Sequence, residues 1–213
     1  MLTNQFMFSK LIDLILHADK FIGPLLEGNH LFVYLFLFII IFVETGLVIM
    51  PFLPGDSLLF IAGTFAAGGF LDIYLLLAIL CVAAVVGDTV NYYLGKVFGE
   101  KLFSKFINPK HMAKTREFYE KYGKKTIVIA RFIPIVRTFA PFVAGIGKMN
   151  YLTFLNYNII GGVSWVLVFL MGGFIFGNIP FVKENLSLIV LGIIFASMIP
   201  VAIEYLRTRS RKA

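Results

Sequence analysis

Four charged side chains lie within strongly apolar stretches of the sequence. Glu44 and Asp56 belong to one such stretch, and Arg131 and Arg137 belong to another. Ionisable groups at membrane depth are costly and usually mark a path for ions, protons or substrate. An arginine fork binds phosphate through two hydrogen bonds, and a desolvated carboxylate can exchange protons. We therefore predict that the arginines bind an anionic headgroup and that the acids couple its movement to protons. An arginine neighbour favours the charged carboxylate, so the sequence leaves the protonation state open.

Helix-breaking residues interrupt both apolar stretches. Proline removes a backbone donor and breaks helical hydrogen bonding. The predicted apex residues are Pro51, Pro54 and Gly55 in the first stretch, and Pro134 and Pro141 in the second. Broken backbone survives at membrane depth only where protein buries it or where it lines a wet cavity. We expect re-entrant helical hairpins at 31–70 and 126–147.

The remaining elements are those of a polytopic membrane protein. Of the 213 residues, 59% are hydrophobic and only 15% are charged, which is typical of an integral membrane protein. Three stretches are long enough to cross a bilayer. The predicted single membrane domain, 1–213, comprises an amphipathic helix at 5–26, the two hairpins, spans at 73–95, 151–177 and 186–206, and a basic loop and helix at 96–125.

Charge patterning sets the predicted topology. The formal net charge is +7, and nine basic residues fall between Lys96 and Lys125. Basic clusters beside apolar spans indicate the cytoplasmic side, and they explain this charge without nucleic-acid binding. The basic C-terminus reaches the cytoplasm only if 126–147 enters the membrane and returns. The N-terminus is then outside, and the hairpins enter from opposite faces.

The two halves of the sequence have an inverted-repeat-like organisation. Each half has a proline-broken hairpin followed by a long span that ends in two glycines four residues apart. These pairs are Gly95 with Gly99 and Gly173 with Gly177. Opposed broken helices that meet near the midplane are typical of many transporters. The predicted fold is therefore all-α, with two opposed re-entrant hairpins and about three full transmembrane helices.

Several polar and aromatic residues have alternative structural roles. The four charges could form buried ion pairs that only hold the hairpins together. Asp88 and Asn91 are interpreted as helix-packing groups or as supports behind the site. Trp165 is interpreted as an interface or packing aromatic. A single cysteine and scattered histidines give no metal-ligand spacing, so we expect no metal or cofactor.

The sequence resembles the DedA family of bacterial inner-membrane proteins, within the wider group that contains the VTT, or SNARE-associated, domain. The resemblance covers about residues 30–207 and is closest to the subgroup that gives the family its name. The motifs are ETGLxxxPFLPGD at 44–56, GDxxNY at 87–92, RFIPIVRTFAPFVAG at 131–145, FGEKLF at 98–103 and FYEKYG at 118–123. The resemblance implies that Glu44 and Asp56 match the family's essential membrane acids, and that Arg131 and Arg137 match its essential arginines.

The resemblance also implies a function. It points to a plasma-membrane flippase that moves undecaprenyl phosphate or a related anionic phospholipid and depends on the proton motive force. The residues themselves leave two alternatives open, a proton-coupled small-ion antiporter and a non-transporting assembly factor. We do not expect an enzyme, because phosphatase chemistry usually needs a histidine near the phosphate and the hairpins contain none. The sequence does not fix the oligomeric state, and a homo-oligomer is compatible with it.

Overall fold

The computed structural model describes residues 30–47, 55–106, 117, 119–186 and 188–193, and this part of the chain is helical and has no strands. The predicted amphipathic helix 5–26, Pro51, Pro54 and most of the predicted span 186–206 lie outside the described residues. The elements are α3 (His30–Gly46), α4 (Gly55–Ala67), α5 (Ile73–Phe106), the 3₁₀ turn η1 (Gly123–Lys125), α7 (Thr126–Ala130), α8 (Pro134–Ile146), α9 (Tyr151–Val166), the π-helical η2 (Leu167–Met171), α10 (Gly172–Phe176) and α11 (Pro180–Glu184).

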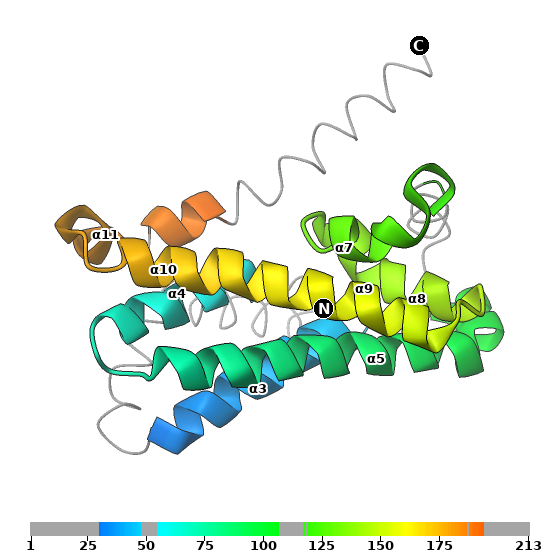
Figure 1. The fold of residues 1–213 in the computed structure, drawn as a ribbon, viewed down its shortest axis with the longest axis horizontal. Coiled ribbons are helices and arrows are strands. Elements are labelled where there is room, and N and C mark those ends of the chain that lie inside the picture. Colours follow the sequence, from blue (N-terminus) through cyan, green and yellow to red (C-terminus); the bar gives the residue numbers. More distant parts are fainter. Residues whose placement is uncertain (1–29, 48–54, 107–116, 118, 187, 194–213) are drawn as a thin grey trace, which may run out of the picture.

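Two long helical segments form the body of the fold. One is α5, and the other is the continuous run of α9, η2 and α10, which lies alongside it in Figure 1. Their apolar parts, Ile73–Gly99 and Tyr151–Phe176, have 27 and 26 residues. A membrane helix needs about 20 residues, so both are long enough to span a bilayer.

Helix α5 continues further than the sequence predicts. The predicted span ends at residue 95, whereas the helix runs on to Phe106, into the segment predicted as a basic loop. No proline lies between Gly95 and Phe106, and the lysine, glutamate and leucine residues there all favour helix. The charge pattern predicts where the membrane ends, but it does not predict where the helix ends.

The shorter helices form two units, α3 with α4 and α7 with α8. We call the end of each unit where its first helix ends and its second begins the closed end, and ion pairs join the two closed ends. The opposite ends have other neighbours. The backbone N–H of Asp72 donates to the Tyr34 hydroxyl at 2.7 Å, so the start of α3 lies beside the turn that follows α4. In the second unit, η1 packs against α9, which begins just after α8. The turn at 131–133 separates α7 from α8, as predicted. The placement of these units as re-entrant hairpins in a membrane stays a prediction.

Each unit packs its second helix against a long helix from the other half. A Cβ on Gly95 of α5 would overlap the backbone carbonyl of Phe142 in α8, and one on Gly173 of α10 would overlap that of Phe60 in α4. Glycine is therefore required where these backbones touch, as in small-residue packing of membrane helices. The second helix of each unit thus packs on a long helix of the other half, while the inverted-repeat-like arrangement stays a prediction.

The prolines of the second unit have different roles. Pro134 is at the N-terminal end of α8, where its missing N–H costs no helical hydrogen bond. Pro141 lies inside α8, and the helix continues through it. The prediction that Pro141 interrupts the backbone at a hairpin apex is therefore wrong, because packing of α8 against α5 outweighs the loss of one hydrogen bond.

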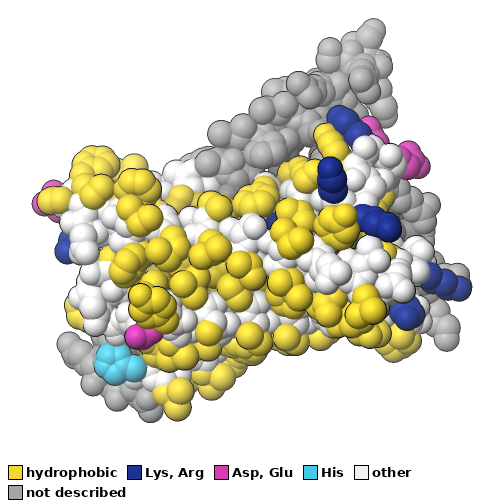
Figure 2. Space-filling view, viewed as in Figure 1, with side chains coloured by type: hydrophobic (Ala, Val, Ile, Leu, Met, Phe, Trp, Pro, Cys, Tyr) yellow, Lys and Arg dark blue, Asp and Glu magenta, His cyan; other side chains and the backbone are white. Residues whose placement is uncertain are grey.

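The surface has a broad apolar face between two charged ends. Figure 2 shows hydrophobic side chains across the face formed by α5 and α9, and Lys and Arg side chains gathered at one end. Leu75 and Val82 of α5 and Ile160 of α9 are examples of exposed apolar residues on these helices. The exposed lysines at 96, 121, 124, 125 and 148 lie in or beside the segments that meet at the basic end. A broad apolar face of this kind is typical of a membrane protein, and the placement of the basic end in the cytoplasm stays a prediction.

Candidate functional site

The closed ends of the two units bring Arg137 against two acids. Glu44 lies in the last turn of α3, Asp56 in the first turn of α4, and Arg137 in α8. The Nη1 atom of Arg137 is 3.2 Å from Oδ1 of Asp56 and 3.4 Å from Oε1 of Glu44. In this ion triad, Glu44 and Arg137 are buried, at 5% and 7% exposed, and the side chain of Asp56 is part-buried, at 18% exposed.

Trp165 completes the surroundings of the ion triad. Its indole Nε1–H donates to Oδ1 of Asp56 at 2.7 Å. Its ring lies against the guanidinium of Arg137, with the guanidinium carbon 3.8 Å from the ring centroid. The side chain of Trp165 is fully buried. Trp165 is thus a packing aromatic, as the sequence suggests, but it packs against the charged site.

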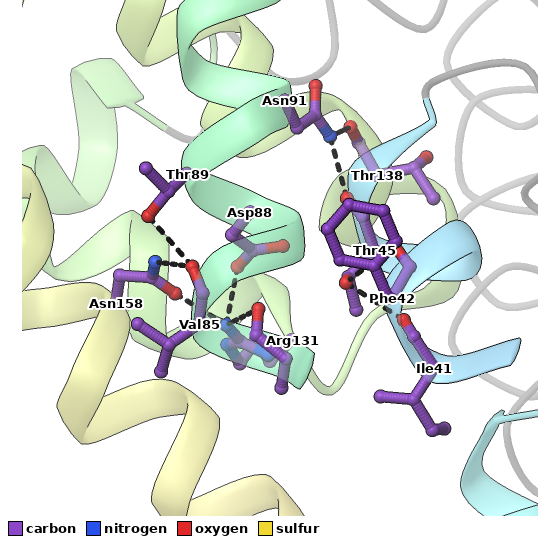
Figure 3. Close-up of polar contacts among 11 residues, drawn as sticks. Ile41, Phe42, Thr45, Val85, Asp88, Thr89, Asn91, Arg131, Thr138 and Asn158 are labelled. Carbon is purple, nitrogen blue, oxygen red and sulfur yellow. Dashed lines mark hydrogen bonds and ion pairs between the residues drawn. The ribbon is translucent and has the colours of Figure 1, made fainter. Parts of the chain in front are cut away.

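Arg131 has a separate set of partners, shown in Figure 3. Its Nη2 atom lies 2.5 Å from Oδ2 of Asp88 and 2.5 Å from Oδ1 of Asn158. The amide of Asn158 also donates to the carbonyl of Val85 at 2.9 Å. Arg131 follows α7, Asp88 lies in α5 and Asn158 lies in α9, so this polar group joins three helices.

Asn91 connects the two units to α5. Its Nδ2 atom donates to the carbonyl of Thr45 in α3 at 3.1 Å and to that of Thr138 in α8 at 2.9 Å (Figure 3). Both amide hydrogens are used, and the side chain is fully buried. Asn91 therefore holds the end of α3 and the first half of α8 at a fixed distance from each other.

The two arginines offer different free donors. Among the described residues, Nε and Nη2 of Arg137 have no hydrogen-bond partner, and neither have Nε and Nη1 of Arg131. Nε and Nη2 are neighbours on one edge of a guanidinium plane, and their N–H bonds point the same way. Such an edge matches two oxygens of one phosphate or carboxylate. Arg137 keeps a complete edge, whereas both edges of Arg131 include the Nη2 atom that Asp88 and Asn158 occupy.

The charges of the described buried and part-buried groups do not balance. Three carboxyl groups, of Glu44, Asp56 and Asp88, face the two guanidinium groups of Arg131 and Arg137. One carboxylate is in surplus when every group is ionised, and an unpaired buried charge is costly. The Oε2 atom of Glu44 is buried without a hydrogen-bond partner among the described residues. The cluster is thus suited to hold one proton.

The sequence-predicted residues divide into three groups. Glu44, Asp56 and Arg137 meet as predicted, while Arg131 lies with Asp88 and not against either acid. Gly55 lies beneath the carboxylate of Glu44, where a Cβ would overlap it, and Pro51 and Pro54 lie outside the described residues. Sequence reasoning missed Asn158, although the asparagines at 156 and 158 in an otherwise apolar predicted span are a signal that could have found it. No group of ligand residues that could hold a metal occurs within the described ranges.

Known proteins resemble this chain over most of its length. The VTT domain family matches residues 53–175. Protein DedA of Escherichia coli (strain K12) is 50% identical over 209 residues, which cover 95% of each chain. A membrane protein of Mycobacterium leprae is 43% identical and covers 78% of this chain and 76% of its own. The inner membrane protein YqjA of Escherichia coli (strain K12) is 34% identical over 69% of each chain. No solved structure matches the chain.

The domain match and the match to Protein DedA both cover charged residues of the candidate site. The VTT domain match contains Asp56, Asp88, Arg131 and Arg137, and it ends ten residues after Trp165. The match to Protein DedA extends this likeness to nearly the whole sequence. This chain is therefore a member of the DedA family of VTT-domain membrane proteins.

Proposed function

We propose that this protein is a lipid transporter of the bacterial inner membrane that moves the headgroup of undecaprenyl phosphate, or of a related anionic phospholipid, across the bilayer. The observation that carries the proposal is the free edge of Arg137, which is buried where the two units meet. A buried arginine edge is a good match for phosphate, and a lipid tail can remain in the surrounding hydrocarbon. Protein DedA and the inner membrane protein YqjA are the relatives that support this setting.

Proton coupling follows from the charges of the cluster. A phosphate at Arg137 adds negative charge beside Glu44 and Asp56, where one carboxylate is already in surplus. Binding of the headgroup and binding of a proton then favour each other, because the positive charge of the proton offsets the negative charge that the phosphate adds. Glu44, whose Oε2 atom lacks a described partner, is the group that we assign to the proton. This linkage would let the proton motive force drive the headgroup across.

Transport in reconstituted vesicles tests the proposal. We would load one leaflet with labelled undecaprenyl phosphate, impose a pH gradient and follow movement of the headgroup. Arg137→Lys keeps the charge but removes the fork, so we expect transport to fall at least tenfold. Lys148→Ala, an exposed change at the basic end, is the matched control and should transport normally. Unchanged transport by Arg137→Lys would exclude the proposed site. No inorganic phosphate should be released, because we propose transport and not hydrolysis.

The two alternatives have their own outcomes. In an ion antiporter, vesicles without anionic lipid would show ion flux under a pH gradient, and Glu44→Gln would abolish it. In an assembly factor, the charges would only hold the fold together, and the ion pair between Glu44 and Arg137 is compatible with that role too. The double variant Glu44→Arg with Arg137→Glu would then restore function. We expect neither result, because reversed charges would turn the free arginine edge away from the headgroup.

A further inference from the structure

We propose that Trp165 is the positioning residue of the anion site, and that it fixes Arg137 so that only the Nε–Nη2 edge can meet a phosphate. This inference rests on the proposed function and assigns to its site a residue from the long α9–α10 segment. Trp165 is fully buried and contacts both members of the Asp56–Arg137 ion pair.

Stacking explains how the edge is selected. The guanidinium of Arg137 lies 3.8 Å from the centroid of the Trp165 ring, so the indole covers one face of the plane. The Nη1 atom is held by Asp56 and Glu44. With one face and one nitrogen occupied, the Nε–Nη2 edge is the part left for a ligand. A cation against a desolvated tryptophan face is strongly favoured, so the stack resists rotation of Arg137.

The shared oxygen explains how a phosphate could compete for the arginine. Oδ1 of Asp56 accepts both the Trp165 Nε1–H, at 2.7 Å, and the longer contact from Arg137, at 3.2 Å. A phosphate that draws Arg137 away takes a cation from the part-buried carboxylate of Asp56, which is costly. The indole N–H keeps one hydrogen bond to Asp56 throughout. Trp165 therefore lowers the cost of exchanging Asp56 for the phosphate at Arg137.

The chain provides its own reporter for this exchange, because Trp165 is its single tryptophan. We would titrate the purified full-length protein in detergent with dodecyl phosphate, a single-chain phosphate monoester, and record tryptophan emission. The expected result is a saturable change that dodecanol does not produce. Arg137→Lys should abolish the change. A wild-type protein that binds dodecyl phosphate by calorimetry without any change in emission would overturn the inference.

Graded variants test the positioning role itself. Trp165→Phe keeps a ring but removes the N–H, and Trp165→Leu removes both. By calorimetry we expect dodecyl phosphate affinity to fall roughly threefold in the first and thirtyfold in the second, from the loss of a buried cation–π contact. Tyr74→Leu, at a position that is 79% exposed, is the control and should bind as wild type. A purely structural role would lower thermal stability in the Trp165 variants but leave affinity in the folded fraction unchanged, and that result would contradict us.

The two proposals fail in different ways. If wild-type protein binds no dodecyl phosphate at all, the proposed anion site fails and the inference fails with it. If wild-type protein binds it and Trp165→Leu binds it equally well, only the role of Trp165 is wrong. If Trp165→Leu does not fold, Trp165→Phe and the emission titration still decide.

Discussion

Individual buried polar residues hold the two units in register. Asn91 is the clearest case, because one amide nitrogen serves carbonyls from α3 and α8. Those carbonyls belong to Thr45 and Thr138, which lie next to or near the charged residues of the site. The distance between the two closed ends therefore depends on a single side chain of α5.

Replacing this amide should destabilise the fold. Asn91→Leu has similar volume but leaves two buried carbonyls without that donor, so we expect a loss of roughly 2–4 kcal/mol in unfolding free energy. Asn178→Ala is the control, because Asn178 also donates to a carbonyl, that of Ala67, but is exposed. Unfolding in mixed detergent measures both. Equal stability of Asn91→Leu and wild type would show that Asn91 does not join the units.

The Arg131–Asp88 pair should behave as a buried ion pair. Asp88→Ala leaves the Arg131 guanidinium charged and without its carboxylate, at a cost of about 3–5 kcal/mol. The double variant Asp88→Leu with Arg131→Met removes both charges and should recover most of that stability. Thermal unfolding of the purified variants gives the comparison. A double variant that is as unstable as the single one would mean that Asp88 stabilises the fold in another way.

The residue types of the site could be predicted from sequence, but not all of their partners. Acids and arginines in apolar stretches were sufficient to predict that Glu44, Asp56 and Arg137 converge. That Arg131 meets Asp88 and Asn158 depends on how α5, α7 and α9 rotate against one another, which no local pattern encodes. The contact of Trp165 with Arg137 could not be predicted either, since an isolated aromatic in a span is equally typical of ordinary packing and of contact with a site.

At the scale of elements, glycine sets how closely the helices of the two halves approach. The contact between α4 and α10 depends on Gly173, whose Cβ position is occupied by the Phe60 carbonyl, while the adjacent Gly172 only meets the Phe60 ring at 3.9 Å. Gly172 and Gly173 are adjacent in α10, but only Gly173 lies against the backbone of α4. They therefore provide a matched pair of variants.

We expect Gly173→Ala to push α4 away from α10, and Gly172→Ala to be tolerated. Backbone cannot yield as a flexible side chain can, so overpacking should cost about 1–3 kcal/mol in the first variant. Thermal unfolding in detergent measures stability, and the vesicle assay measures transport. If Gly172→Ala were the more damaging change, the close crossing between α4 and α10 would be incorrect.

Helix breaks could be predicted from sequence better than helix continuity. Proline marked the turn before α8, since it removes a backbone donor, while the predicted break before α4 lies outside the described residues. The same rule failed at Pro141, where packing against α5 keeps α8 continuous. The π-helical segment Leu167–Met171 contains no proline or glycine, and it packs against α4 together with α10.

At the scale of the whole molecule, charge and apolar surface define an axis. Exposed lysines gather at one end, and Asp72, Lys183 and Glu184 are exposed in segments at the opposite end, near the turn between α4 and α5 and near α11 (Figure 2). If residues 126–147 are re-entrant, the start of α7 and the C-terminus of α8 both lie on the same side of the membrane as the exposed lysines. Membrane topology therefore tests the re-entrant prediction directly.

Cysteine labelling should find both ends of the second unit on the cytoplasmic side. In a Cys81→Ser background, Lys124→Cys and Lys148→Cys should react with an impermeant maleimide only after the membrane is opened. Asp72→Cys should react from outside in intact cells. The positive-inside rule gives these sides. Reaction of the residue 124 and residue 148 positions from opposite sides would show that 126–147 crosses the membrane completely.

The most direct measurement is to locate a bound lipid headgroup in the protein. We would determine the structure in nanodiscs that contain undecaprenyl phosphate, with the Arg137→Lys variant prepared in the same way. The account predicts phosphate density about 3 Å from Nε and Nη2 of Arg137, between the closed ends of the two units, and no such density in the variant. Phosphate held only by the exposed lysines at the basic end, or bound equally in Arg137→Lys, would contradict it.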